Sequence, residues 1–248
     1  MTGVHPSLVE RHFPMKRYTL PVTAVLLAFT IAAAGWAQSN WEGPTGAYLN
    51  PLAWNLPAWQ GQGALHYLDL QPAGSLTTYG ASYGLTDRLE AGLTQASLSI
   101  GGSSKTNILH AKYILRPLGG GKPGVAVGAV LRDISGGAST SDYYLVATHI
   151  FPAKTPVIAS VTVRSTNGLG SGLFGKTGRT TEFGGFLGVQ VRPNLIPNME
   201  FLGQPDGPDW KDIGVRWIAN PTTYWDFGIA DVANGLDDQL ALGVTHQF

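Results

Sequence analysis

Histidine and serine side chains are the first to weigh for chemistry, because a His–Ser pair can perform acyl transfer and clustered histidines can bind zinc. Beyond residue 37 the histidines are His66, His110, His149 and His246. None stands in a His-x-x-x-His or His-Glu-x-x-His arrangement, so we expect no metal site. We also expect no catalytic residues and no cofactor. The alternative to a protein without catalytic residues is a β-barrel enzyme that acts on lipids, with His149 as its general base.

Ionisable residues recur at alternate positions of apolar segments, where their side chains point to one side of a strand. In a membrane barrel that side faces the lumen. The lumen-facing candidates are Glu90, Lys112, Arg132, Arg164, Glu182, Arg192, Glu200, Asp212, Arg216 and Asp226. Both signs of charge are present, and opposite charges in a narrow barrel can pair. The mixture predicts a packed or weakly conducting interior rather than a channel lined by one sign.

Apolar residues alternate with small or polar residues along twelve segments, each near the length that a tilted membrane strand needs. These predicted strands are 61–70, 75–85, 88–100, 106–116, 124–134, 142–151, 157–166, 181–192, 196–203, 209–219, 224–232 and 238–248. Within 157–166, Val161 belongs to the apolar row and Thr162 to the row that faces the lumen. An arginine at Thr162 should be tolerated better than one at Val161, because a lumen can hydrate its charge.

The composition excludes several other classes of protein. Charged residues are only 13% of the chain, well below the usual quarter of a soluble domain. Basic and acidic residues number 16 each, so no basic excess points to nucleic acid. The sequence has no cysteine and therefore no disulfide framework. We predict an all-β fold, a single antiparallel transmembrane β-barrel of about twelve strands with both termini in the periplasm.

The N-terminus has the pattern of an export signal. Lys16 and Arg17 precede an uncharged apolar stretch that ends in the small-x-small site at residues 35–37. These features predict a secretory signal peptide, residues 1–37, cleaved after Ala37. Residues 1–14 do not resemble a basic n-region, so Met15 is a candidate start. The alternative is an uncleaved transmembrane helix, which the length of the stretch allows.

The last strand alternates to the end of the chain, with Leu240, Leu242, Val244, His246 and Phe248 on one side. This ending resembles the final strand of bacterial outer-membrane barrels, which typically closes on Phe. The resemblance implies that Phe248 is part of a signal read by the barrel-assembly machinery. His246 departs from the pattern, because the family usually has an aromatic or aliphatic residue there.

Residues 38–60 form a separate segment before the barrel at residues 61–248. Pro44, Pro51 and Pro57 interrupt it, which makes it too irregular for a strand. We expect it to lie across the periplasmic mouth or to enter the lumen as a small plug.

Two stretches carry a more specific resemblance. One is residues 42–51, EGPTGAYLNP; the other joins residues 200–207, EFLGQPDG, to 213–217, IGVRW. They are similar to the Pro-Thr-Gly…Asn-x-Pro opening and the Gly-x-Arg-aromatic strand of the YjbH-like family, outer-membrane proteins associated with exopolysaccharide. The resemblance implies a role in surface-polysaccharide production or export and implies no catalytic residues.

We therefore predict a protein of the bacterial outer membrane, in contact with outer-membrane lipid and the barrel-assembly machinery. Its predicted function is association with surface polysaccharide or passage of solutes through a narrow channel. Nucleic acid is not an expected partner. Besides the lipid-acting enzyme, the sequence leaves open a soluble secreted β-sandwich that binds sugar.

Deleting Phe248 should lower the amount of folded barrel in the outer membrane, because the assembly machinery would lose part of its signal. The folded fraction is measured by heat-modifiable gel shift of outer-membrane fractions. Normal levels of the deletion variant would argue that the ending is incidental.

Overall fold

A computed structural model describes residues 38–70, 72–134, 139–168, 176–203, 209–231 and 239–248. The predicted signal peptide, residues 1–37, lies outside this part of the chain. No helix among the described residues is long and apolar enough to cross a membrane.

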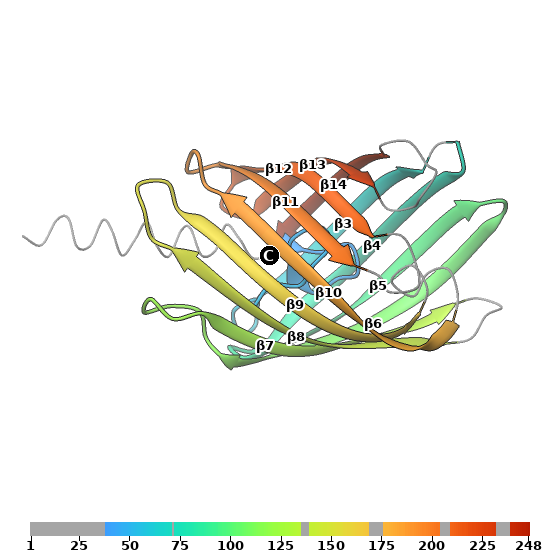
Figure 1. Ribbon diagram of the computed structural model, residues 1–248, viewed down its shortest axis with the longest axis horizontal. Coiled ribbons are helices and arrows are strands. Elements are labelled where there is room, and N and C mark those ends of the chain that lie inside the picture. Colours follow the sequence, from blue (N-terminus) through green and yellow to red (C-terminus); the bar gives the residue numbers. More distant parts are fainter. Residues whose placement is uncertain (1–37, 71, 135–138, 169–175, 204–208, 232–238) are drawn as a thin grey trace, which may run out of the picture.

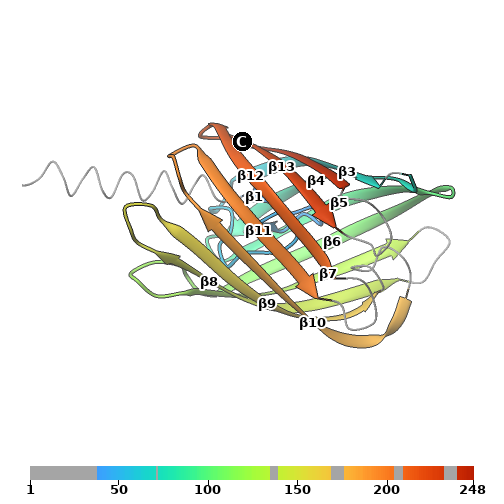
Figure 2. The same cartoon turned by 45° about the horizontal axis from the view of Figure 1, so that its top comes forward.

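Twelve antiparallel strands form a closed barrel in which each strand pairs with its neighbours in sequence (Figures 1 and 2). The last strand closes the ring by pairing with the first, from Ala241↔Leu68 to Gln247↔Gln62. The strands are β3 (Gly61–Leu70), β4 (Gly74–Thr86), β5 (Leu89–Ile100), β6 (Ser103–Arg116), β7 (Gly124–Ile134), β8 (Thr140–Phe151), β9 (Val157–Gly168), β10 (Lys176–Val189), β11 (Leu195–Gly203), β12 (Trp210–Asn220), β13 (Thr223–Asp231) and β14 (Gln239–Gln247). The predicted all-β fold, a single antiparallel barrel of twelve strands, is confirmed, and its closed sheet excludes the two-sheet sandwich.

Alternation along each strand turns apolar side chains outward and polar or small ones inward. In β9, Val161 and Val163 are exposed, whereas Thr162 and Arg164 are buried inside. Large apolar residues cover the outer face of all twelve strands, among them Leu93, Leu109, Leu145, Phe183, Ile213 and Leu240. An exposed apolar band of this extent, on a sheet without free edges, is the surface of a membrane-spanning barrel.

Two predictions about β10 and its turn are corrected. The strand begins at Lys176 and ends at Val189, with a shift of register between Lys176 and Thr180. Arg192, predicted to face the lumen, is instead exposed in the turn and pairs through its backbone with Leu195. The physical reason is that the chain leaves the ladder after Val189, because the N–H of Val191 bonds back to the carbonyl of Val189 and not to a neighbouring strand. Arg192 then closes the turn that contains Pro193.

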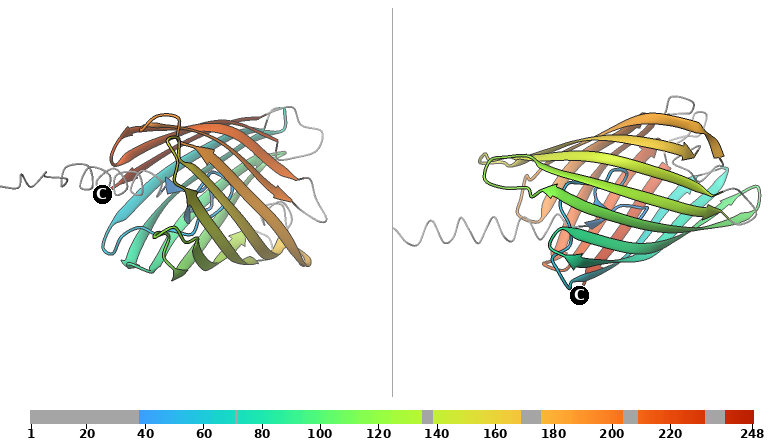
Figure 3. Two further views of the ribbon diagram at one scale, coloured as in Figure 1. Left: turned by 60° about the vertical axis from the view of Figure 1, so that its left-hand side comes forward. Right: turned by 90° about the horizontal axis from the view of Figure 1, so that it is seen from below.

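The interior of the barrel is occupied by residues 38–57, which we call the inner segment. It appears in blue between the strands in Figure 1 and in the view from below in Figure 3. It contains two short paired strands, β1 (Gln38–Ser39) and β2 (Thr45–Gly46). Residues 38–53 and Leu56 are buried, although they have no regular apolar face.

A filled interior changes the expectation for Thr162. Its side chain is 1% exposed, so an arginine there would meet packed atoms rather than water. Hydration in the lumen therefore cannot make Thr162→Arg a tolerated substitution. A comparison with Val161→Arg requires a different control variant.

Val161→Arg should destabilise the folded barrel by roughly 2–4 kcal/mol, because Val161 lies mid-strand on the lipid face and is 65% exposed. Leu115→Arg is the matched control, since Leu115 is exposed near the end of β6, where the cost should fall to about 0–1 kcal/mol. Unfolding free energies in lipid vesicles give the comparison. Equal costs would contradict the assigned depth of the two residues.

Candidate functional site

Many charged side chains are buried inside the barrel. Charged residues that are at most 6% exposed comprise Glu42 of the inner segment and, on the wall, Glu90, Lys112, Arg132, Asp142, Arg164, Glu182, Glu200, Asp212, Arg216 and Asp226. Burial of so many charges is costly unless each finds a partner. The partners of these charges therefore determine whether the lumen is filled or open to solutes.

Two arginines form ion pairs with the carboxylate of Glu42. Arg132 on β7 donates to Oε1 of Glu42 through its Nε and Nη2, and Arg164 on β9 lies 3.2 Å from Oε2. Asp142, on the strand between them, contacts Arg132 at 2.6 Å and Arg164 at 3.1 Å. Thr166 donates a further bond to Asp142. Two cations and two anions are thus enclosed together, and one anion comes from the inner segment.

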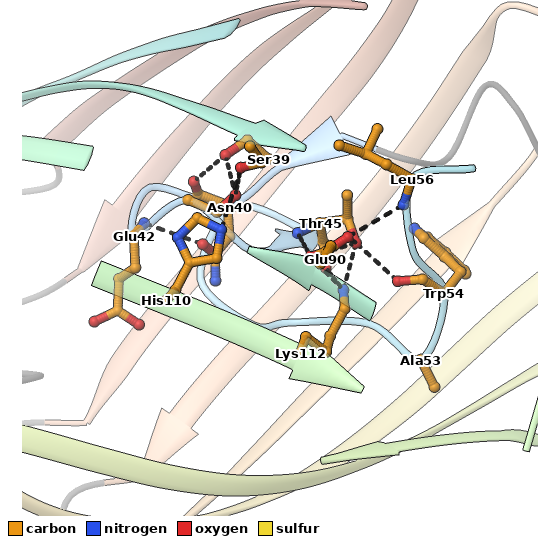
Figure 4. A network of polar contacts seen from close by, with 12 residues as sticks. Ser39, Asn40, Glu42, Thr45, Ala53, Trp54, Leu56, Glu90, His110 and Lys112 are labelled. Carbon is orange, nitrogen blue, oxygen red and sulfur yellow. Dashed lines mark hydrogen bonds and ion pairs between the residues drawn. The ribbon is translucent and has the colours of Figure 1, made fainter. Parts of the chain in front are cut away.

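Glu90 and Lys112 form a second group with the inner segment (Figure 4). Glu90 lies 3.1 Å from Lys112, which donates to the carbonyl of Thr45 at 2.6 Å. Thr45 returns its backbone N–H to Glu90 Oε1 at 2.8 Å and its hydroxyl to Oε2 at 2.8 Å. The N–H of Leu56 reaches Oε2 at 3.1 Å. The Glu90–Lys112 ion pair therefore holds the inner segment at two points, Thr45 and Leu56.

Glu200 on β11 binds three successive backbone N–H groups of the inner segment. Tyr48 donates at 2.6 Å, Leu49 at 2.9 Å and Asn50 at 3.0 Å. The amide of Asn50 also donates to the carbonyls of Gly185 and Phe201. A turn whose N–H groups converge on one carboxylate is a small anion-binding nest.

A fourth contact lies where the inner segment begins. Arg216 on β12 pairs with Asp226 on β13 at 3.0 Å and donates to the carbonyl of Gly46 at 3.4 Å. The side-chain amide of Gln38 also donates to Asp226. Residues 42–51 therefore touch two of the strands on which the predicted resemblance depends, through Gly46 with Arg216 and through residues 48–50 with Glu200.

Glycines on the wall make room for the inner segment. A Cβ at Gly184 would lie 2.1 Å from Oδ1 of Asn50, and one at Gly124 would lie 2.7 Å from the carbonyl of Ala53. Two cavities between the inner segment and the wall, beside Tyr48 and beside Trp41, measure about 10 Å³ each. Each has room for about one water molecule. Beside Tyr48 and Trp41 the described residues therefore leave almost no free space in the lumen.

Ser82 and His110 form a polar pair that sequence reasoning missed. Ser82 Oγ lies 3.2 Å from Nε2 of His110 and donates to the carbonyl of Gly43 at 2.8 Å. The sequence around it, Gly80-Ala81-Ser82-Tyr83-Gly84, has Gly-Xaa-Ser-Xaa-Gly spacing, a signal that could have identified it. The motif lies within strand β4 rather than on a strand-to-helix elbow, so its usual catalytic context is missing. The pair anchors the inner segment.

His149 lies on the other side of the wall. Its ring packs edge-on against Phe151 at 4.5 Å in the row of β8 that faces outward. Its Nδ1 has no hydrogen-bond partner among the described residues. A Ser–His site requires the two side chains within hydrogen-bond reach, and the described residues place no serine there.

The wall residues predicted from sequence occupy different positions. Lys112, Arg132, Arg164, Glu182, Asp212 and Arg216 are buried on the inner face, whereas Arg192 is in the turn described above. Asp142 was missed, although it alternates in phase with Tyr144 and Val146 along β8. Phe248 lies at the barrel seam, where its backbone exchanges two 2.9 Å bonds with Gly61 and its ring is 74% exposed.

No family model matches the chain, and no curated protein matches it. The resemblance to the YjbH-like family therefore stays a prediction. The fold is similar to solved outer-membrane barrels. Omp33 of Acinetobacter baumannii aligns over 77% of this chain and 98% of its own, with a TM-score of 0.53 and 11% identity. The KdgM porin aligns over 75% and 99%, with a TM-score of 0.59 and 9% identity.

The COG4313 outer membrane channel from Pseudomonas putida F1 aligns over 81% of this chain and 100% of its own, with a TM-score of 0.50 and 15% identity. The closed barrel and its apolar outer surface are those of a bacterial outer-membrane β-barrel, similar in fold to small porins and channels.

Glu42→Gln should lower the free energy of unfolding by about 3–5 kcal/mol, because two buried arginines would be left with Asp142 as their only anion in the group. Glu182→Gln is the control, since Glu182 is also buried but its Oε2 has no bond among the described residues. Urea unfolding of both variants in detergent measures the difference. A larger loss for Glu182→Gln would contradict the central role of Glu42.

Proposed function

We propose that the protein is an outer-membrane channel closed by its own inner segment, with both termini on the periplasmic side. The signal peptide cleaved after Ala37 would deliver it to the periplasm, and Phe248 would take part in its assembly. Cleavage at that point makes Gln38 the first residue of the mature chain. The inner segment would then be the N-terminal segment of the mature chain, and its first residue, Gln38, contacts Asp226 inside the barrel.

The observation that carries this proposal is the enclosure of Glu42 of the inner segment by Arg132 and Arg164 of the wall. A structural barrel would need only wall-to-wall pairs to fill its interior. Here the wall charges hold a segment whose N-terminal end is not part of any barrel strand. Such a segment can leave as a unit, with each wall group then exposed to water.

The exposed wall would favour a carboxylated solute. Arg132 and Arg164 converge on one carboxylate, and arginine is well suited to this planar group. Glu200, which accepts three N–H groups, would become free to accept hydroxyl groups. One of the structurally similar porins, KdgM, was solved in complex with disordered oligogalacturonate. A saccharide with carboxylate groups would suit both the arginine pair and Glu200. The role in surface polysaccharide that the sequence predicts is therefore part of this proposal.

Planar-bilayer recordings should give no stable conductance steps for the wild-type chain and clear steps after deletion of residues 38–57. Glu42→Arg is a second variant with the full chain, in which three neighbouring positive charges should expel the inner segment. Conductance steps of the wild type as large as those of the deletion variant would contradict the proposal.

A disulfide lock provides the control for Glu42→Arg. The sequence has no cysteine, and a Cβ at Gly184 would lie 3.2 Å from Cγ of Asn50. A cysteine pair at these two positions is therefore within bridging distance. Adding Asn50→Cys and Gly184→Cys to Glu42→Arg should abolish the conductance under oxidising conditions, and reduction should restore it. Conductance that ignores the lock would mean that the current does not pass where the inner segment lies.

A further inference from the structure

The outer face of strands β5 to β10 carries a groove of about 600 Å³. One bank is a row of larger side chains that includes Tyr113, Leu145 and Val163. The floor contains Ala111 and Ala129, whose short side chains leave the space. All described neighbours of the groove belong to the barrel wall, and the surrounding surface is the apolar band that faces lipid.

The strand register explains the direction of the groove. Leu89, Tyr113, Val127, Leu145 and Val163 pair in succession across β5 to β9 and form a single transverse row. Ala111, Ala129, Tyr143, Ser165 and Thr181 form the adjacent row across β6 to β10. The groove therefore runs across the strands rather than along them. Six strands at about 4.8 Å spacing make it roughly 24 Å long.

Because barrel strands tilt by about 35–45°, a groove that crosses them is oblique in the membrane. Leu89 is the first residue of β5, at the same end of the barrel as the C-terminus. Ser165 lies near the last residue of β9, and Thr181 lies in the first half of β10. Both positions are toward the other end of the barrel from Leu89. The groove thus rises from the periplasmic side toward the outer surface, in the orientation proposed above.

An arginine sits at the upper end of the groove. Arg179 lies within the irregular register of β10 between Lys176 and Thr180, a place where a bulge can redirect a side chain. Its guanidinium crosses the outer face to Ser165, at 3.1 Å from the carbonyl, and to Oγ of Ser141 at 2.8 Å. The same group stacks over Tyr143, 5.2 Å from the ring centre.

Arg179 is exposed and retains donors for a ligand. A guanidinium has five N–H donors, and among the described residues Arg179 makes bonds only to Ser141 and Ser165. The stacking and the two serines fix the plane of the group and aim it along the surface. A cation held next to an apolar groove on a membrane face is complementary to a lipid with an anionic headgroup.

We infer that this surface binds a phosphorylated glycolipid of the outer leaflet. One acyl chain lies in the groove over Ala111 and Ala129, and the phosphate accepts hydrogen bonds from Arg179. The site is on the opposite side of the wall from the inner segment. It depends on the proposed orientation but not on channel activity.

The test is native mass spectrometry of the full-length mature protein, delipidated and then titrated with diphosphoryl lipid A. The wild type should retain one lipid A tightly. Arg179→Gln should weaken binding about tenfold or more, the size expected for loss of a charged hydrogen bond. Ala129→Phe should fill the groove and weaken binding through the acyl chain.

Matched controls lie elsewhere on the barrel. Lys211→Gln removes an exposed cation at the outer end of β12, and Ala81→Phe adds the same bulk at an exposed alanine of β4. Both should bind lipid A as the wild type does. A heat-modifiable gel shift establishes that each variant is folded, and Arg179→Gln alters only an exposed group.

Equal binding by Arg179→Gln and Lys211→Gln would overturn the inference. A preference for phosphatidylglycerol over lipid A would also overturn it, because the occupant would then be a phospholipid. Failure of the conductance experiment alone would leave this result unaffected, so the two proposals are separable.

Discussion

The pairing of buried charge is the constraint on which the rest of this barrel depends. A closed sheet in lipid satisfies its backbone internally and must keep polar side chains on the inside. A narrow interior then offers little water to solvate them. Arg132 and Arg164 gain their second carboxylate only from Glu42, and Glu200 gains its donors from residues 48–50. The wall and the inner segment are thus each incomplete without the other.

This mutual dependence explains two features of composition. Glycine is abundant, and at Gly84, Gly124 and Gly184 a side chain would collide with atoms of the inner segment. Three prolines fall within the twenty residues of the inner segment, which therefore bends repeatedly and presents backbone N–H groups to the wall in turns rather than in ladders. The wall charges are arranged to receive those groups.

The sequence predicts the barrel well because period-two alternation encodes which face each side chain takes. Strands such as β3 and β7 have the predicted bounds, and Arg132 and Arg164 are inside as their parity requires. Alternation says nothing of contacts, so the enclosure of Glu42 and the Ser82–His110 pair could not be derived from it. It also fails where regularity ends: the irregular register before Thr180 and the turn that contains Arg192 depend on local geometry.

Residues 38–57 illustrate the same limit. They lack periodicity, and their position follows from partners that are distant in the chain. Gln38 bonds to a residue 188 positions away, and Asn50 to one 150 positions away. In kinetic terms these are among the most non-local contacts a chain of this length can make, and loop closure must precede them. Until β11 to β13 have joined the sheet, the N–H groups of residues 48–50 lack the carboxylate of Glu200 and the amide of Gln38 lacks Asp226. The ion pairs of Glu42 with Arg132 and of Glu90 with Lys112, by contrast, need only the wall from β5 to β7. The N-terminal half therefore fixes the inner segment by charge first, and the C-terminal strands add hydrogen bonds to it last.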